Sequence, residues 1–173
     1  MPKEKKVRDL MIPIEEYATV PQNATVREAV AAVASSFKQL PTGEYTGHRS
    51  VLVLDGQRRL VGLLTYRDLI RAVEPQLLDA DKLPRGLPWE VDVPDVPWEG
   101  FFEQRSRAEA QKPVSEVMRP LELITVDADA PLLKAIHLML TANIGSVPVM
   151  ENGVIVGMVR MNEVFKAVAD AVL

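Results

Sequence analysis

The chain has 173 residues, 47% of them hydrophobic and 25% charged, with a formal net charge of −4. This composition is ordinary for a folded domain and excludes a largely disordered chain. The slightly acidic balance lacks the basic field that captures a nucleic-acid backbone, so we expect no nucleic-acid partner. The absence of cysteine excludes disulfides, thiolate metal sites and a cysteine nucleophile. The two histidines, His48 and His137, are far apart in sequence, and we expect no metal site.

No signal peptide or membrane span is recognisable in the sequence. The N-terminus MPKEKKVRDL is charged, and nowhere do about 18 apolar residues follow one another. We therefore expect a soluble, cytoplasmic protein without a membrane partner.

Two parts of the chain repeat each other. Val7–Pro13 (VRDLMIP) matches Val114–Pro120 (VSEVMRP) at an offset of 107, and Ser50–Val53 matches Ser146–Val149 at an offset of 96. The falling offset means that the first copy holds extra residues. They lie within Lys38–His48, where a proline and two glycines predict a loop.

The first copy, residues 1–74, is predicted to follow the order β-α-β-β-α. A short strand near 18–20 precedes a helix over Thr25–Phe37, in which apolar residues recur at spacings of three and four. Thr25 and Glu28 predict a capping box at its start. Two strands, Val51–Leu54 and Leu60–Leu64, then flank a turn, and a helix over Tyr66–Val73 closes the copy.

Residues 75–112 are predicted to form an insertion rich in proline and aromatic residues. It contains both tryptophans, and Phe102–Gln111 has the pattern of a helix. Large aromatic side chains need to be buried, so we expect the insertion to pack on the same molecule, or else on another chain.

The second copy, residues 113–173, repeats the order of the first. Pro131 opens a helix, two strands at Val147–Met150 and Val154–Val159 flank an Asn-Gly turn, and a last helix covers Met161–Val172. Each copy is too small to be stable alone. We therefore predict an α+β fold in which the two copies pack sheet to sheet about a pseudo-two-fold axis and leave ligand grooves between them.

The duplicated order, the strands SVLVLD and SVPVME, and Gly62–Asp68 (GLLTYRD) together resemble the paired CBS domain, also called a Bateman module. The resemblance covers nearly the whole chain outside the insertion. It implies a regulatory module that binds an adenine nucleotide (AMP, ADP or ATP), pairs into a homodimer and acts on a separate regulated protein.

The resemblance also implies which residues bind the nucleotide. Asp68 would hold the ribose hydroxyls, Thr65 would contact phosphate and Arg67 would add a countercharge. A carboxylate can accept two hydrogen bonds from a vicinal diol, and a hydroxyl at a helix N-terminus joins the backbone amides in receiving an anion. The adenine would lie against the other repeat, on Leu123, Ile124, Thr125, Ile144, Gly145, Ser146, Val147 and Pro148.

The equivalent motif of the second copy, Gly157–Glu163 (GMVRMNE), departs from this pattern. Arg160 replaces the hydroxyl and Glu163 replaces the aspartate. We therefore expect one good site and a second that is less suited to a nucleotide. The second site would involve these two residues together with Ala18, Thr19, His48 and Arg49, of which the basic pair could reach phosphates across the module.

Three other interpretations stay open. Thr65 and Asp68 also fit a capping box, which needs no ligand. The chain could be a structural dimerisation module with a vestigial pocket, or it could bind S-adenosylmethionine or a related adenosyl ligand. An enzyme is not expected, because the sequence has no nucleophile–base pair, HExxH motif or P-loop.

Overall fold

The computed structural model describes residues 4–73, 102–118 and 124–173. In the first repeat, β2 (Thr19–Pro21) runs parallel to β5 (Ser50–Leu54), and β5 runs antiparallel to β6 (Leu60–Thr65). The helix α1 (Val26–Ala34) connects the first two strands, and α2 (Tyr66–Val73) follows the third.

The second repeat has the same plan. Its sheet has the order β1 (Ile12–Pro13), β9 (Val154–Arg160), β8 (Ser146–Glu151) and β7 (Val126–Asp127). The helix α4 (Leu132–Ala142) connects β7 to β8, and α5 (Met161–Val172) follows β9. The predicted α+β class and the duplicated β-α-β-β-α order are confirmed.

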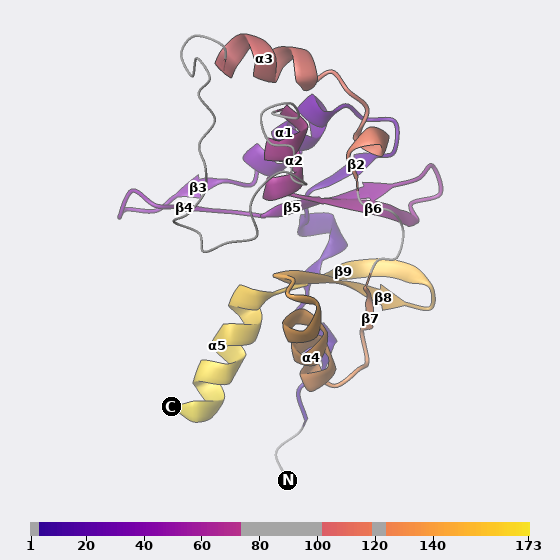
Figure 1. Cartoon of the computed structure of the whole chain (residues 1–173). Coiled ribbons are helices and arrows are strands. Elements are labelled where there is room, and N and C mark those ends of the chain that lie inside the picture. The colour runs from indigo at the N-terminus through magenta and orange to yellow at the C-terminus, as the bar shows by residue number, and fades with distance from the viewer. Residues whose placement is uncertain (1–3, 74–101, 119–123) are drawn as a thin grey trace.

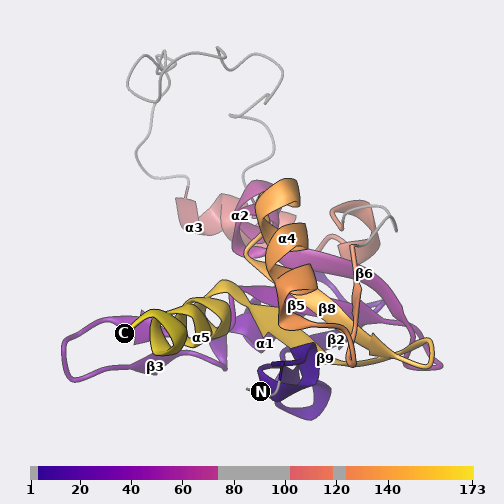
Figure 2. The ribbon, with the colours of Figure 1, turned by 90° about the horizontal axis from the view of Figure 1, so that it is seen from below.

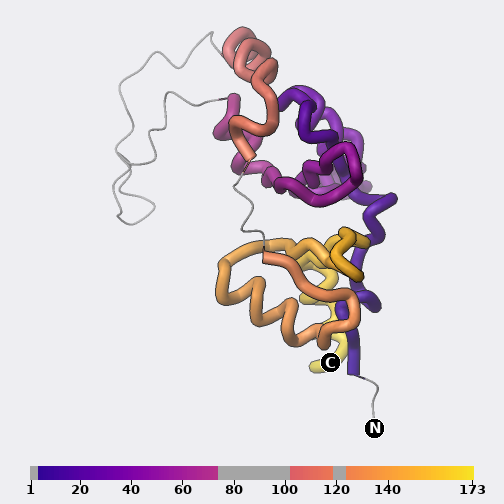
Figure 3. The backbone as a smooth tube through the Cα atoms, turned by 90° about the vertical axis from the view of Figure 1, so that its right-hand side faces the viewer, coloured from indigo at the N-terminus to yellow at the C-terminus, as the bar shows by residue number. Residues whose placement is uncertain are grey.

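The two sheets stack face to face at the centre of the molecule, and helices cover their outer faces (Figures 1 and 3). Side chains alternate between the two faces of each strand, as strand geometry requires. In β5, Val51 and Val53 face the helices, whereas Leu52 joins a cluster with Ile155 and Met158 between the sheets. The alternation therefore builds one core under each set of helices and a third core between the repeats.

Local signals in the sequence set several of the helix ends. Thr25 caps α1: its hydroxyl accepts from the Glu28 amide at 3.3 Å, and the Glu28 carboxylate accepts from the Thr25 amide at 2.7 Å. The helix ends at Ala34, short of the predicted Phe37. The hydroxyls of Ser35 and Ser36 donate to carbonyls of the last turn, and such hydrogen bonds compete with continuation of a helix.

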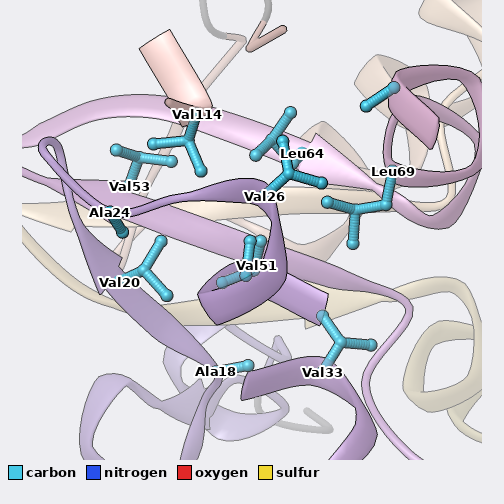
Figure 4. Packing of buried hydrophobic residues seen from close by; sticks show 12 residues of the cluster. Ala18, Val20, Ala24, Val26, Val33, Val51, Val53, Leu64, Leu69 and Val114 are labelled. Carbon is cyan, nitrogen blue, oxygen red and sulfur yellow. The ribbon is translucent and has the colours of Figure 1, made fainter. Parts of the chain in front are cut away.

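The segment that precedes each repeat in the sequence packs against the other repeat. Near the N-terminus, the amide of Val7 donates to Ala130 in the second repeat, and Val7 is fully buried in the core of that repeat. In return, the amide of Val114 donates to Ala24 in the first repeat. Figure 4 shows Val114 packed among the core residues of the first repeat. These reciprocal contacts join the repeats through their main chains as well as through the central core.

Two regions add to the repeated plan. Within Lys38–His48, which the sequence predicts to be a loop, the structure has a two-stranded hairpin of β3 (Lys38–Gln39) and β4 (Tyr45–Thr46). The predicted helix of the insertion is confirmed as α3 (Phe102–Glu109), which packs against α2 (Figure 1). Both tryptophans lie outside the described residues, and the boundaries 1–74, 75–112 and 113–173 remain a prediction.

Candidate functional site

The Thr65–Asp68 motif lies where β6 passes into α2. The Asp68 carboxylate accepts hydrogen bonds from the amide and the hydroxyl of Thr65, both at 2.8 Å, and the Thr65 hydroxyl accepts from the Asp68 amide at 3.3 Å. Asp68 is only 8% exposed, Thr65 is half-buried and Arg67 is exposed. The motif thus forms a capping box, and a ribose or a phosphate would share these groups with the helix end.

The equivalent motif of the second repeat is an ion pair. Arg160, at the end of β9, donates from both Nε and Nη2 to the carboxylate of Glu163 in the first turn of α5, with an Nε to Oε2 distance of 2.9 Å. This partly buried contact raises the pKa of the Arg160 guanidinium. Arg160 also donates from Nη1 to the carbonyl of Gly47 at 3.4 Å. This hydrogen bond links the second repeat to the first.

Two ring side chains of the first repeat lie beside this ion pair. Tyr17 and His48 have ring centroids 4.3 Å apart. The Tyr17 hydroxyl is 2.7 Å from the Ser50 hydroxyl, and His48 Nε2 is 2.8 Å from the Glu16 carbonyl. Because a carbonyl only accepts, Nε2 of His48 carries the proton. Burial is the main cause that lowers the pKa of His48 and raises that of Tyr17. The charge of Arg160 adds to the downward shift of the His48 pKa and opposes the upward shift of the Tyr17 pKa.

We call this group of residues the second cleft: Tyr17, Gly47, His48, Arg160 and Glu163. Of the six residues that the sequence assigned to a second site, the structure brings His48, Arg160 and Glu163 together. Ala18 is buried in the core of the first repeat, Thr19 is half-buried in β2, and the side chain of Arg49 is exposed.

The repeat relation predicts a matching group of residues, which we call the first cleft. At the offsets that relate the two copies, Tyr17 corresponds to Leu123, His48 to Ile144, and the Arg160 and Glu163 pair to Thr65 and Asp68. The strands agree with this: Ser50 pairs in register with Thr65 in the first repeat, and Ser146 pairs with Arg160 in the second.

The predicted adenine-binding residues lie on β8 and on the segments before β7 and β8. Leu123 is outside the described residues. Ile124 is 39% exposed, Thr125 and Gly145 are exposed, Ile144 and Ser146 are half-buried, and Val147 and Pro148 are buried. In the described part of the chain, no atom beyond its chain neighbours lies within 4 Å of the position that a Cβ on Gly145 would take. These residues, which we call the apolar wall, therefore present apolar surface and accessible backbone groups to a ligand.

Sequence reasoning missed Tyr17 and Gly47. A signal for Tyr17 was present, because the repeat alignment sets a tyrosine against Leu123 at one of the cleft positions. Gly47 contributes a backbone carbonyl, and its role depends on the position of Arg160, which only the structure gives.

No three His, Asp or Glu side chains of residues 4–73, 102–118 and 124–173 are grouped so that they could hold a metal ion. None of the helices in these ranges is long and apolar enough to span a membrane.

The CBS domain family model matches residues 7–75 and 114–170, so the chain belongs to the CBS-domain family. The duplicated match and the stacked repeats make it a CBS-domain pair. Such pairs are generally regulatory modules. A search of the curated proteins found no match.

Three solved structures share the arrangement. CBSX2 in complex with AMP has a TM-score of 0.63 and 19% identity, with 96% of this chain and 97% of that one covered. The CBS domain pair of MJ0100 in complex with 5′-methylthioadenosine and S-adenosyl-L-methionine has a TM-score of 0.63 and 18% identity, with 97% of this chain and 98% of that one covered. Protein MJ1004 from Methanocaldococcus jannaschii has a TM-score of 0.61 and 24% identity. The match covers 96% of this chain but only 60% of MJ1004. At these identities the likeness establishes the fold.

Proposed function

We propose that this CBS-domain pair is a regulatory module that binds one adenine nucleotide, AMP, ADP or ATP, in its first cleft. Asp68 holds the ribose, Thr65 and the start of α2 receive the phosphate, and Ile124 and Ile144 contact the adenine. The observation behind the proposal is the contrast between the two clefts.

The first cleft has the chemistry that a nucleoside needs. Ile124 is a partly exposed apolar side chain, and the open space at Gly145 leaves backbone groups accessible. An aromatic base takes dispersion contact from such a wall and hydrogen bonds from backbone groups at its edge. Thr65 and Asp68 at the N-terminal end of α2 add a hydroxyl and a carboxylate, with the positive end of the helix dipole behind them.

The second cleft is occupied by its own side chains. Glu163 is held in the ion pair with Arg160, and the rings of Tyr17 and His48 lie against each other at a tilt. In the repeat alignment these two residues correspond to Leu123 and Ile144. A nucleotide would have to break the ion pair and separate the rings. We infer that this cleft fastens the two repeats together and binds no nucleotide.

The bound molecules of the neighbours support an adenosyl ligand. CBSX2 was crystallised with AMP, and MJ0100 with 5′-methylthioadenosine and S-adenosyl-L-methionine. All of these contain adenine and a ribose, and they differ in what the 5′ carbon carries. The hydroxyl of Thr65 and the dipole of α2 favour an anionic 5′ group, which is the reason we place a nucleotide ahead of S-adenosylmethionine.

Calorimetric titration tests the proposal with a matched pair of variants. Wild-type protein should bind at least one of AMP, ADP and ATP. Asp68→Ala should lower the affinity by about 10- to 100-fold, because hydrogen bonds to a charged group contribute about 1.5–3 kcal/mol each. Glu163→Ala, which removes the equivalent carboxylate of the second cleft, should leave the affinity unchanged.

Asp68→Ala also removes a helix cap, so a thermal unfolding curve of each variant accompanies the titration; the cap contributes about 1 kcal/mol to stability. Absence of heat with all three nucleotides in the wild type refutes the proposal. Displacement of a bound nucleotide by equimolar S-adenosylmethionine would favour the adenosyl alternative instead.

A structural dimerisation module is the second candidate. Its support is the capping box, which gives Thr65 and Asp68 a role without a ligand, and a stripe of exposed apolar residues on α5, namely Phe165, Val168 and Val172, which are 70%, 43% and 77% exposed. Figure 2 shows α5 diverging from α4. A second copy of the chain would cover the stripe, and Phe165→Glu should then dissociate the dimer in sedimentation whether or not nucleotide is present.

A further inference from the structure

A long apolar groove lies on the outer, helical side of the first repeat. It has a volume of about 810 Å³ and runs between α1, α2 and α3. Its apolar lining includes Val30, Phe37, Ile70, Val73 and Phe102. Two of these side chains are largely exposed to solvent: Ile70 is 64% exposed and Phe102 is 72% exposed. Contiguous apolar surface of this kind marks a place where another segment or molecule binds.

The ends of the groove coincide with the two ends of one chain segment. Val73 is the last residue of α2 and Phe102 the first of α3, and both line the groove. Residues 74–101 connect them, so this segment leaves from the groove and returns to it. A tethered segment is present at a high effective concentration, and a binding event within one chain needs less contact energy than one between chains.

The composition of this segment complements the groove. Residues 89–99 read WEVDVPDVPWE, in which tryptophan and valine alternate with carboxylates, and residues 74–101 hold seven acidic side chains against two basic ones. The apolar lining of the groove is bordered by Arg27 on α1 and Arg107 on α3, both exposed. Apolar residues flanked by acids therefore meet an apolar surface flanked by arginines.

We propose that residues 89–99 of the same chain occupy this groove, with Trp98 as the apolar anchor and the neighbouring carboxylates directed toward Arg27 and Arg107. Trp98 stands four residues before Phe102, so it can reach the α3 end of the groove without a long connection. A tryptophan in a pocket with charged groups at its rim is the usual form of a strong anchor.

Tryptophan fluorescence tests this directly, because the only two tryptophans of the chain, Trp89 and Trp98, both belong to the segment. In the wild type the emission should be blue-shifted and acrylamide quenching weak. Ile70→Glu places a carboxylate in the groove, and the emission should shift toward that of a solvent-exposed indole while quenching increases. Arg107→Glu, at the rim, should act in the same direction.

Phe165→Glu is the matched control. Phe165 occupies on α5 the position of Ile70 on α2, at the repeat offset of 95, and is 70% exposed. This variant should leave the tryptophan emission unchanged. Ile70 and Phe165 both lie outside the cores of the repeats, so neither glutamate places a charge in a core, and far-UV circular dichroism checks the fold.

Two results would overturn the proposal. One is wild-type emission already typical of an exposed indole, or emission that Ile70→Glu does not change. The other is a loss of dimer mass in sedimentation on Ile70→Glu with unaltered tryptophan emission, which would assign the groove to a second copy of the chain.

Discussion

Arg160 gives the second motif a chemistry that the first motif lacks. In the first repeat the same position is Thr65, a hydroxyl at the start of a helix; in the second it is a cation that Glu163 neutralises within the same turn. A partly buried ion pair with a further hydrogen bond to Gly47 is costly to break, because separation leaves a charge in a poorly solvated place. The two motifs therefore differ in chemistry although the backbone repeats.

His48 should make the stability of the protein depend on pH in a predictable direction. Its Nε2 donates to the Glu16 carbonyl, and Nδ1 is buried without a hydrogen-bond partner among the described residues, so a second proton would have no acceptor. Burial lowers the pKa of His48 from its ordinary value of 6.5. As the pH falls below about 6.5, the unfolded chain takes up the proton first, and folding stability is lost.

The measurement is the unfolding temperature between pH 7.5 and pH 5.5. The wild type should lose more stability over this interval than His48→Gln, which does not titrate and can still donate to the Glu16 carbonyl. His137→Gln, which removes the exposed histidine of α4, serves as the control. Equal losses in the wild type and His48→Gln would contradict the assigned role.

At the residue scale, the sequence predicted what depends on local pattern. The capping box of Thr65 and Asp68 could be predicted, because the two residues are three apart in the chain. Arg160 and Glu163 have the same spacing, but their ion pair was not predicted, since each was interpreted as a possible ligand contact. The partners of Tyr17 could not be predicted in this way: Ser50 is 33 positions away, and the tyrosine meets it through the pairing of β2 with β5. Contacts between distant residues need the register of the strands.

Among the elements, the exchanged segments explain how two small repeats form one stable unit. Val7 belongs to the core of the second repeat and Val114 to that of the first, and both are fully buried. Gly157 lies so close to the carbonyl of Ile12 on β1 that a side chain would not fit, and Gly62 has Met118 in the equivalent place. The repetition of these close contacts shows that the exchange is built into both copies.

This exchange predicts that each valine stabilises the repeat at the other end of the sequence. Val7→Ala should cost about 2 kcal/mol of unfolding free energy through two lost methyl groups and the cavity they leave. Its effect on amide hydrogen exchange should be largest in β8 and β9, whereas Val114→Ala should act mainly on β5 and β6. Faster exchange in the repeat that contains the substitution, with the other unaffected, would contradict the exchanged arrangement.

The elements themselves were predictable where apolar periodicity and turn residues agree, as in α1, α4 and the strands on either side of Asn152-Gly153. The sequence did not predict the hairpin of β3 and β4, because Lys38–Gln39 and Tyr45–Thr46 are exposed two-residue strands without an apolar face. The exchange of segments was also not predicted, since nothing in VRDLMIP or VSEVMRP says which repeat each will contact.

Taken as a whole, the molecule combines a symmetric backbone with two unequal clefts. In the second cleft, Arg160 and Glu163 of the second repeat lie beside Tyr17 and His48 of the first. In our proposal the first cleft has the reverse arrangement, with Thr65 and Asp68 from the first repeat and an apolar wall from the second. A ligand in one cleft alone would act on the contact between repeats unevenly, which is a simple basis for regulation.

The most direct test of the unequal clefts is a set of crystal structures of the protein grown with saturating AMP, ADP or ATP. We predict a nucleotide in the first cleft in at least one of them, with the ribose hydroxyls on Asp68 and the adenine against Ile124 and Ile144, and an intact Arg160–Glu163 pair in the second. A nucleotide bound in the second cleft, or both clefts without any of the three while the capping box of Thr65 and Asp68 persists, would contradict the account.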